Sequence, residues 1–184
     1  MLRPPLKYCR VCGAAVVYRL PDDGDTRERA VCPGCNTVHY DNPHNVVGTV
    51  PVWGESGAQV LLCKRNIEPR RNKWTLPAGF LEMGETTAQG AARETDEEAG
   101  ARFELGGLFT VMNVVRVGQV HFYYHARLLG IDFDPGYETV EARLFTEAEI
   151  PWDEIAFRTV KETLEHYFSD RRKGQFGIHV FDVA

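Results

Sequence analysis

Apolar and polar positions alternate in short blocks along the middle of the chain, as expected where strands are short. The segments 46–53 (VVGTVPVW) and 59–65 (QVLLCKR) are rich in β-branched and aliphatic residues, and GESG between them is typical of a turn. KWTLPAG (73–79) is typical of a short strand that ends in a Pro/Gly loop. Three further extended segments are predicted at 101–117, 119–129 and 138–145, the first two joined by a turn at RVGQ.

Two helices are predicted from helical periodicity. The first begins at Thr86, which forms a capping box with Gln89, and stops at Gly100. The second covers 152–168 (WDEIAFRTVKETLEHYF), with a mixed-charge outer face. Small residues at helical spacing give the first helix a face that can lie close against a sheet: Ala88, Ala91, Ala92, Thr95 and Ala99. This order of strands and helices predicts an α/β sandwich, with the tail 171–184 as an edge strand or a partner contact.

The composition mainly argues against certain classes of protein. The 184 residues are 43% hydrophobic and 26% charged, which suits one globular domain with an appendage. The net charge of −5 argues against a general binder of nucleic acids or membrane surfaces, because such proteins are usually basic. No apolar run approaches the roughly 20 residues of a membrane span, and MLRPPLKYCR lacks the apolar core of a signal peptide. We expect a cytoplasmic protein with no membrane partner.

Four of the five cysteines form two pairs near the N-terminus: Cys9 and Cys12 in CRVC, and Cys32 and Cys35 in CPGC. In an intracellular chain this spacing predicts a tetrahedral four-thiolate zinc site, with redox-active or disulfide-bonded cysteines as the alternatives. Few large apolar residues lie between the pairs, so we expect residues 1–44 to depend on the metal for folding. Cys63 lies in an apolar run and is predicted to be an inert core thiol.

Four carboxylates crowd into the segment RETDEEAG (93–100). Glu94, Glu97 and Glu98 fall at i, i+3 and i+4, so they share one helix face, which we expect opposite the small-residue stripe. Like charges at this spacing cost about a few tenths of a kcal/mol. A solvated acidic face is one interpretation, and Asp96 fits it. The other is a site for Mg²⁺ or Mn²⁺, because hard divalent cations require convergent carboxylates.

The surroundings of the carboxylates favour the metal site. Residues 79–101 (GFLEMGETTAQGAARETDEEAGA) fit the pattern G-x5-E-x7-R-E-U-x-E-E-x-G-U, where U is a bulky apolar residue. Thr95 and Ala101 depart from it at the two apolar positions, although both still suit a packing face. The segment resembles the Nudix box, the loop–helix–loop signature of hydrolases that act on nucleoside diphosphates linked to another group. The matched positions are Gly79, Glu85, Arg93, Glu94, Glu97, Glu98 and Gly100.

The resemblance implies a fold and a set of roles. The fold would be a Nudix α/β/α sandwich with a mixed sheet, preceded by a small zinc-ribbon domain. Arg93 and Glu85 would fix the loop, Arg93 would also orient Glu97, and Gly79 would let the backbone pass close to a phosphate. Catalytic Mg²⁺ or Mn²⁺ would lie among the box glutamates. The general base is left open, with Glu94 as the first candidate.

A second acidic segment, GYETVEARLF (136–145), is similar to an E-x-x-E-A-R-W-F-like segment of Nudix enzymes that carry an N-terminal ribbon, with Leu144 in place of Trp. Its first glutamate reaches back to the metals in those enzymes. The resemblance therefore adds Glu138 to the metal ligands, with Glu141 as the lesser candidate. The alternative is an exposed glutamate at the end of a strand.

The substrate is constrained by what is missing. A ribbon joined to a Nudix domain resembles the NADH pyrophosphatases, but RFELGGLFTVMNVV stands where their S-Q-P-W-P-F-P segment belongs. The proline typical of ADP-ribose pyrophosphatases and the signature of coenzyme A hydrolases are also absent. The chain is similar to a ribbon-bearing subgroup linked to FAD and ADP-ribose cleavage, so these two substrates are predicted ahead of NADH. Trp74, Phe80 and Tyr123 are candidates to stack on the substrate's rings, with core packing as the alternative.

A nucleic-acid-binding or regulatory protein, with the ribbon as reader and the Nudix domain as sensor, is the competing hypothesis. Residues 1–44 carry six Lys/Arg against five Asp/Glu, a poor match to a phosphate backbone. Nudix sensors commonly lose a box carboxylate, whereas none is lost here. We therefore expect an enzyme with a small nucleotide substrate, forming a homodimer. Its expected domains are the ribbon and connector (1–44), the hydrolase domain (45–170) and the tail (171–184).

Overall fold

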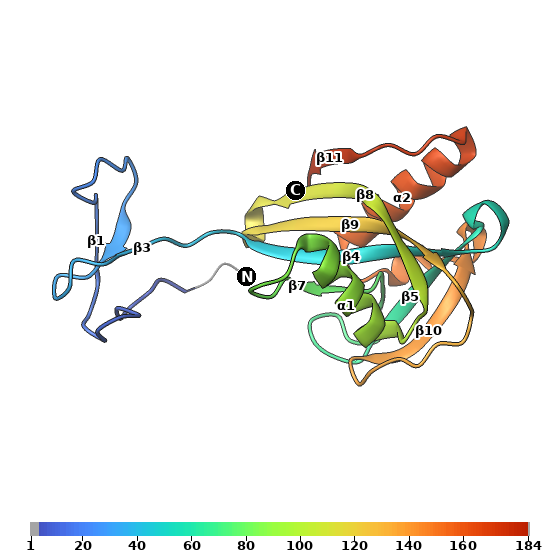
Figure 1. The fold of residues 1–184 in the computed structure, drawn as a ribbon, viewed down its shortest axis with the longest axis horizontal. Helices are drawn as coiled ribbons and strands as arrows, with labels where there is room; N and C mark the ends of the chain where they lie inside the picture. Colours follow the sequence, from blue (N-terminus) through green and yellow to red (C-terminus); the bar gives the residue numbers. More distant parts are fainter. Residues whose placement is uncertain (1–3, 184) are drawn as a thin grey trace. The chain divides into compact units, whose positions relative to one another are not determined.

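The computed structural model describes residues 4–183 and contains two compact units, with the boundary between Pro43 and His44 (Figure 1). The first unit holds a three-stranded antiparallel sheet in the order β1-β2-β3. The polar segment between Arg19 and Arg29 joins β1 to β2 as a hairpin. The strands of this unit are β1 (Val17–Arg19), β2 (Arg29–Val31) and β3 (Val38–His39).

The second unit is built on a mixed sheet of eight strands. The main path runs β10-β5-β4-β9-β8-β11, while β6 pairs with β5 and β7 pairs with β4. The β4–β9 and β8–β11 pairs are parallel, and the remaining pairs are antiparallel. The strands are β4 (His44–Trp53), β5 (Gln59–Arg65), β6 (Trp74–Thr75), β7 (Ala78–Phe80), β8 (Phe103–Val114), β9 (Gln119–Leu128), β10 (Thr139–Thr146) and β11 (His179–Asp182).

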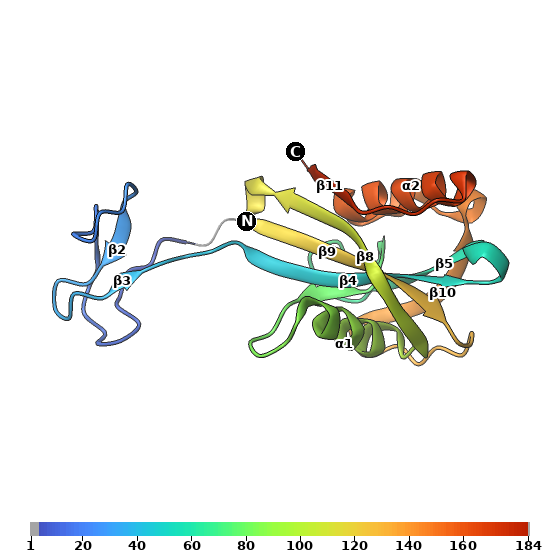
Figure 2. The ribbon, with the colours of Figure 1, turned by 45° about the horizontal axis from the view of Figure 1, so that its top comes forward.

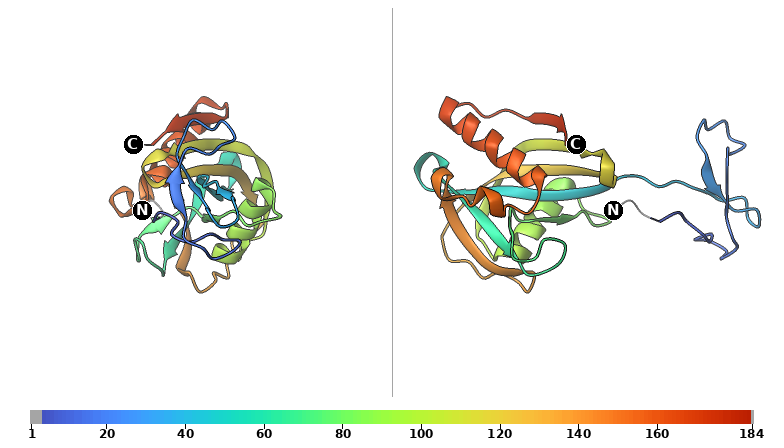
Figure 3. Two further views of the ribbon diagram at one scale, coloured as in Figure 1. Left: turned by 90° about the vertical axis from the view of Figure 1, so that its left-hand side faces the viewer. Right: turned by 180° about the vertical axis from the view of Figure 1, so that it is seen from behind.

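Two α-helices cover opposite faces of this sheet (Figure 2). Helix α1 (Thr87–Ala99) has the expected capping box between Thr86 and Gln89, and it ends at Gly100 in the left-handed conformation. Its residues Ala91, Thr95 and Ala99 are buried, so the small-residue face packs on the sheet as predicted. Helix α2 (Arg158–Lys173) crosses the other face (Figure 3). The expected α/β sandwich is therefore confirmed.

The start of α2 differs from the expected helix over 152–168. Residues Trp152–Glu154 form a separate 3₁₀ turn, η4. The chain then extends, because Ile155 bridges to Trp74 and the Ala156 amide donates to the Trp74 carbonyl at 2.8 Å. The helix ends at Lys173, so residues 171–173 of the expected tail are helical. Residues His179–Asp182 of the tail form β11, an edge strand, which was one of the tail's two expected roles.

Each face of the sheet has its own hydrophobic core. The larger lies under α2 and includes Val160, Leu164 and Phe168 of that helix. The smaller, with Leu61, Cys63 and Leu128, packs against the C-terminal end of α1. Cys63 is fully buried, which raises the pKa of its thiol and agrees with an inert core residue. Within residues 4–183, neither α1 nor α2 has the length and apolar character needed to cross a membrane.

Candidate active site

The N-terminal part of the box places a glycine against a carboxylate. Gly79 lies on β7, which pairs with β4 and faces α1. A Cβ at Gly79 would lie 2.3 Å from the carboxyl carbon of Glu94. The absence of a side chain at Gly79 therefore makes room for the Glu94 carboxylate. Gly79 was expected to let the backbone pass close to a phosphate. In the structure it also lets the backbone pass close to Glu94, a candidate metal ligand.

Arg93 is the centre of the box. Its Nε donates to Glu85 Oε1 at 2.6 Å, and its Nη1 donates to Glu94 Oε1 at 2.8 Å and to Glu97 Oε2 at 3.0 Å. Its Nη2 reaches Glu85 Oε2 and the carbonyl of Phe80, both at 3.1 Å. These bonds tie the loop 81–86 to the helix and lower the pKa of Glu85. The bond from Arg93 to Glu97 is the one expected from the i, i+4 spacing.

Glu98 differs from the other box glutamates because it is buried, with 6% of its surface exposed. Its carboxylate accepts a hydrogen bond from the backbone amide of Ala78 at 3.0 Å. Burial, followed by the charges of Glu94 and Glu138, raises the pKa of Glu98 to about 8. The expectation that all three carboxylates point away from the packed face is therefore wrong for Glu98, which lies between α1 and β7.

Glu94 and Glu97 take intermediate and exposed positions. Burial raises the pKa of Glu94, and the hydrogen bond from Arg93 opposes that rise. The side chain of Glu97 is 58% exposed. Exposure to solvent therefore increases from Glu98, which is buried against the sheet, through Glu94 to Glu97.

Glu138 lies close enough to these residues to act on them. Its charge contributes to the raised pKa values of both Glu94 and Glu98. Its own carboxylate accepts a hydrogen bond from the phenol of Tyr137 at 2.7 Å. The segment expected to reach back to the metals is therefore next to the box, whereas Glu141 pairs with Lys64 along β10 and β5.

The donor set suits a hard divalent cation. Glu94, Glu97, Glu98 and Glu138 offer only carboxylate oxygens, the ligands that Mg²⁺ and Mn²⁺ prefer. Burial disfavours the charged form of Glu98, and a divalent cation beside it would offset that cost. Among residues 4–183, these carboxylates do not form a converged group of ligand atoms as the paired cysteines do.

The family comparisons agree with this arrangement. The model of the NUDIX domain matches residues 42–167, and the zinc-ribbon model described as Nudix N-terminal matches residues 7–41. The chain belongs to the Nudix family. The resemblance seen in residues 79–101 is thereby confirmed for most of the chain.

Two kinds of relatives extend the match. A crystal structure of a NUDIX hydrolase from Nitrosomonas europaea is 48% identical with a TM-score of 0.88, covering 97% of this chain and 100% of that one. The NAD-capped RNA hydrolase NudC of Photobacterium profundum is 29% identical over 147 residues, which is 78% of this chain and 51% of NudC. The putative mutator protein MutT4 of Mycobacterium tuberculosis is 33% identical over 141 residues, 72% of this chain and 54% of MutT4. The chain spans about half the length of these two curated relatives.

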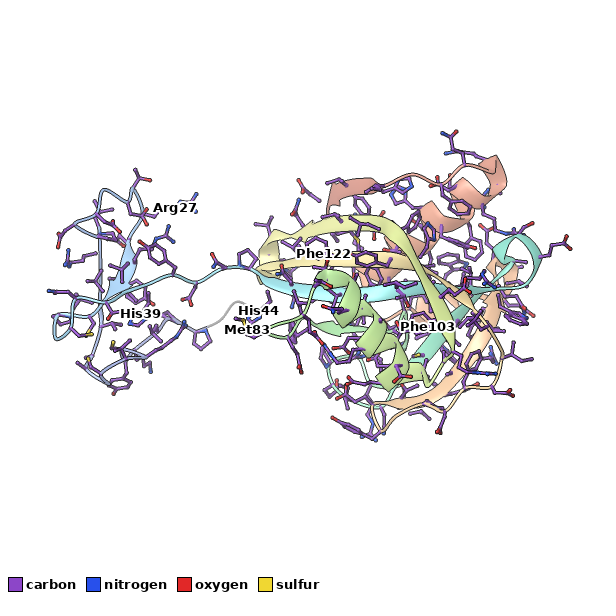
Figure 4. The ribbon with its side chains drawn as sticks, viewed as in Figure 1. Arg27, His39, His44, Met83, Phe103 and Phe122 are labelled. Carbon is purple, nitrogen blue, oxygen red and sulfur yellow. The ribbon has the colours of Figure 1, made fainter. Side chains whose placement is uncertain are left out.

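The aromatic candidates of the Nudix unit divide into two groups. Tyr123 is 2% exposed and Trp74 is buried, and both belong to the core under α2. Trp74 packs edge-on against Phe145 at 4.8 Å, and Arg143 lies 5.5 Å from its ring. These two residues therefore fit the alternative, core packing. Phe80 is 54% exposed and lies 5.2 Å from the ring of His44, which Figure 4 labels.

The four paired cysteines of the ribbon unit come together. Their sulfur atoms all lie within 4.8 Å of one another, with Cys9 and Cys35 at 3.6 Å and Cys12 and Cys32 at 3.4 Å. Tetrahedral zinc with Zn–S bonds of ~2.3 Å separates its sulfurs by about 3.8 Å, so the group fits the metal. Thr37 hydrogen-bonds with Cys35 Sγ at 3.1 Å, which lowers the pKa of that thiol, whereas the neighbouring cysteines raise the pKa of Cys12.

Several residues at these sites were missed from the sequence. His39 on β3 (Figure 4) places Nε2 at 3.3 Å from Cys9 Sγ, where it can orient a ligand. The Ala78 amide that binds Glu98 is a backbone group, so no side-chain pattern could reveal it. Thr95 departs from the box pattern but is fully buried, and its hydroxyl hydrogen-bonds with Thr49 at 2.7 Å and donates to the Ala91 carbonyl at 2.8 Å.

A separate cavity of about 460 Å³ lies under α2 and is lined by Val52, His125, Tyr167 and Phe176, among others. None of the box carboxylates lines it. It is therefore not part of the candidate active site, although its volume exceeds that of a buried water site.

Proposed function

We propose that this chain hydrolyses the pyrophosphate bond of a dinucleotide-type nucleoside diphosphate derivative, with Mg²⁺ or Mn²⁺ as cofactor. The observation that carries the proposal is the box itself, in which one arginine holds three glutamates beside a fourth, buried one. Such an arrangement concentrates negative charge in a way that stability alone does not require. A divalent cation bound among these glutamates would neutralise their charge and connect them to an anionic substrate.

Glu94, Glu97, Glu98 and Glu138 are the residues that would hold the metal. A divalent cation held there would supply charge neutralisation at the pyrophosphate and activation of the attacking water. Arg93 keeps Glu94 and Glu97 oriented, and the Ala78 amide keeps Glu98 in place. Glu94 is the first candidate general base if the metal does not take up its whole carboxylate, since a free carboxylate oxygen beside the metal can accept a proton from the attacking water.

The products follow from attack at phosphorus. A water adds to one phosphate of the pyrophosphate, the bridging oxygen leaves with the other phosphate, and the proton of the water goes to the base. Cleavage of FAD would give AMP and FMN, and cleavage of ADP-ribose would give AMP and ribose phosphate. FAD and ADP-ribose are proposed ahead of NADH, because the segment that marks the NADH pyrophosphatases is missing. The name of the NudC relative nevertheless places NAD(H)-type substrates in any test.

A substrate panel tests the proposal. FAD, ADP-ribose, NADH, NAD-capped RNA, diadenosine polyphosphates and nucleoside triphosphates would be incubated with Mg²⁺ or Mn²⁺, and the phosphomonoesters released would be measured. We expect cleavage of FAD or ADP-ribose and loss of activity in Glu97→Gln and Glu98→Gln proteins that keep their circular dichroism spectra. Cleavage of triphosphates or capped RNA alone would overturn the substrate class, and near-full turnover in both variants would overturn the metal assignment.

The zinc ribbon is proposed to have a structural role, and the homodimer remains a prediction. Sedimentation of the purified protein with and without a zinc chelator would measure both the assembly state and its dependence on the ribbon.

A further inference from the structure

Two exposed arginines lie on the loop between β5 and β6. Backbone hydrogen bonds close this loop at its base, from the Arg65 amide to the Lys73 carbonyl at 2.9 Å and from the Asn72 amide to the Arg65 carbonyl at 2.8 Å. Arg70 and Arg71 stand at the exposed part of the loop, and neither forms an ion pair with another described residue. The guanidinium of Arg70 makes no hydrogen bond to a described residue either, so it is free to meet an anion.

Asn66 ties this loop to the segment that carries Glu138. Its backbone amide donates to the Glu138 carbonyl at 2.7 Å, and its Nδ2 donates to the Tyr137 carbonyl at 2.8 Å. Its Oδ1 accepts from Arg71 Nη2 at 3.1 Å. The arginine-bearing loop and the Tyr137–Glu138 segment therefore form one hydrogen-bonded surface at the edge of the candidate active site.

Tyr137 is an exposed aromatic residue of this surface, with 82% of its area open to solvent. Its hydroxyl donates to Glu138 Oε1 at 2.7 Å, which fixes one end of the ring. The ring faces are left accessible. Of the aromatic candidates from the sequence, Trp74 and Tyr123 are buried and Phe80, on β7, is exposed. Tyr137 adds an exposed ring next to Glu138, where it can contact a base.

The charge around the carboxylates shows why these arginines matter. Arg93 is committed to Glu85, Glu94 and Glu97. Arg65 is buried, donates to the Pro69 carbonyl at 2.9 Å and lies 5.1 Å from the ring of Phe157. Arg93 and Arg65 are therefore engaged by other groups. Among the described residues, Arg70 keeps its guanidinium open to an anion, and Arg71 bonds only the neutral side chain of Asn66. Guanidinium groups are well suited to phosphate oxygens, because they present several N–H donors in a fixed plane.

We propose that Arg70, Arg71 and Tyr137 form a subsite for the nucleoside monophosphate half of the substrate. The two guanidiniums bind its phosphate, and the phenol ring stacks on its base. The inference rests on the proposed function, since it assigns a second part of the substrate to a surface beside the proposed metal ligands. It also places the product nucleotide where it would compete with substrate.

Binding of the product nucleotide tests the subsite without any turnover. AMP and adenosine would be titrated calorimetrically into the full chain with Mg²⁺ present, for the wild type and for three variants. Arg70→Gly combined with Arg71→Ala removes both guanidiniums, and glycine suits the φ of 69° at position 70. Tyr137→Leu removes the ring, and Tyr137→Phe keeps the ring while losing the bond to Glu138. Arg172→Ala is the matched control, because Arg172 lies in the last turn of α2 and loses only an exposed ion pair with Glu147.

The subsite predicts a distinct result for each variant. Wild type should bind AMP more tightly than adenosine, and the arginine variant should lose about tenfold in AMP affinity with little change for adenosine. Tyr137→Leu should weaken both ligands by roughly tenfold, and Tyr137→Phe and Arg172→Ala should bind like wild type. AMP affinity that is unchanged in the arginine variant, or a wild type that binds no AMP, would overturn the subsite.

Hydrolysis separates this inference from the proposed function. A wild type that cleaves FAD or ADP-ribose while the arginine variant keeps its KM leaves the function in place and removes the subsite. A wild type that cleaves none of the panel but still shows the arginine-dependent difference between AMP and adenosine removes the proposed function and keeps a nucleotide site.

Discussion

At the scale of single residues, the site is set by close contacts that tolerate little change. Arg93 makes bonds to three carboxylates, Glu98 is buried against β7, and Gly79 leaves room for Glu94. The residue types and their spacing were visible in the sequence. The contact between Gly79 and Glu94 was not, because it joins a strand to a helix and depends on how closely the two pack.

The close contact at Gly79 predicts a local loss of activity. In Gly79→Ala the new Cβ would lie 2.3 Å from the Glu94 carboxyl carbon, so that carboxylate must move. We expect kcat on the best substrate to fall by about tenfold or more, with little change in the far-UV spectrum, because a misplaced catalytic group costs rate before it costs folding. Gly107→Ala on β8 is the control, since its Cβ would meet no atom within 4 Å. Equal activity in the two variants would contradict the contact.

A buried histidine on β9 predicts how stability depends on pH. Burial lowers the pKa of His121 to about 4, and its Nδ1 has no partner in the described part of the chain. The unfolded chain binds a proton on this histidine near pH 6.5, whereas the folded chain does so only at about pH 4. The free energy of unfolding is therefore unaffected by His121 above about pH 6.5 and decreases as the pH falls from there toward 4. The loss attributable to this residue amounts to about 3 kcal/mol.

Urea unfolding at several pH values from 7.5 to 4.5 measures that loss. Carboxylates titrate alike in the wild type and in His121→Gln, so their contribution cancels in the difference between the two. The variant should gain stability relative to wild type as the pH falls. Parallel curves would show that His121 is protonated without penalty in the folded chain.

At the scale of elements, the sequence predicted what local signals determine. The capping box and Gly100 place both ends of α1, and the apolar runs place β4 and β5 within two residues. The second helix starts later than expected, because the bridge between Ile155 and Trp74 holds the chain extended at Ile155, ahead of the helix. Such a bridge joins positions far apart in the chain, as does the parallel pairing of β11 with β8. Periodicity cannot report either one.

The capping box predicts a measurable share of stability for α1. Thr86 accepts from the Gln89 amide at 3.2 Å, and the Gln89 side chain accepts from the Thr86 amide at 2.9 Å. Thr86→Ala should cost about 1 kcal/mol and lower the Tm of the second unit by roughly 2–4 °C. Thr86→Ser keeps the side-chain oxygen and should restore most of the loss. A Tm that is the same in both variants would mean that the cap adds little once α1 is packed on the sheet.

At the scale of the whole molecule, the two units are held together internally by different means. The second has two hydrophobic cores around a sheet, whereas the described residues of the first bury few large side chains around three short strands. Several apolar side chains of the first unit, including Tyr8, Val11 and Leu20, are exposed. A unit of this size without a large core usually needs a metal or a disulfide, and its cysteines lie close together with their thiols free.

Metal removal should therefore act on one unit and spare the other. Elemental analysis should find about one zinc per chain, both in wild type and in Glu97→Gln, since the cysteine group and the glutamate lie in different units. A strong chelator, or Cys12→Ser, should unfold the first unit, because the free energy of zinc binding is largely its folding free energy. Amide hydrogen exchange should then show full exchange up to about Pro43, while amides in β4, β5 and β9 stay protected. Two results would contradict the prediction that zinc stabilises the first unit alone. One is iron, or four free thiols, in the purified protein. The other is a loss of protection throughout the second unit, which would mean that the ribbon contributes to the stability of the hydrolase fold as well as to its own.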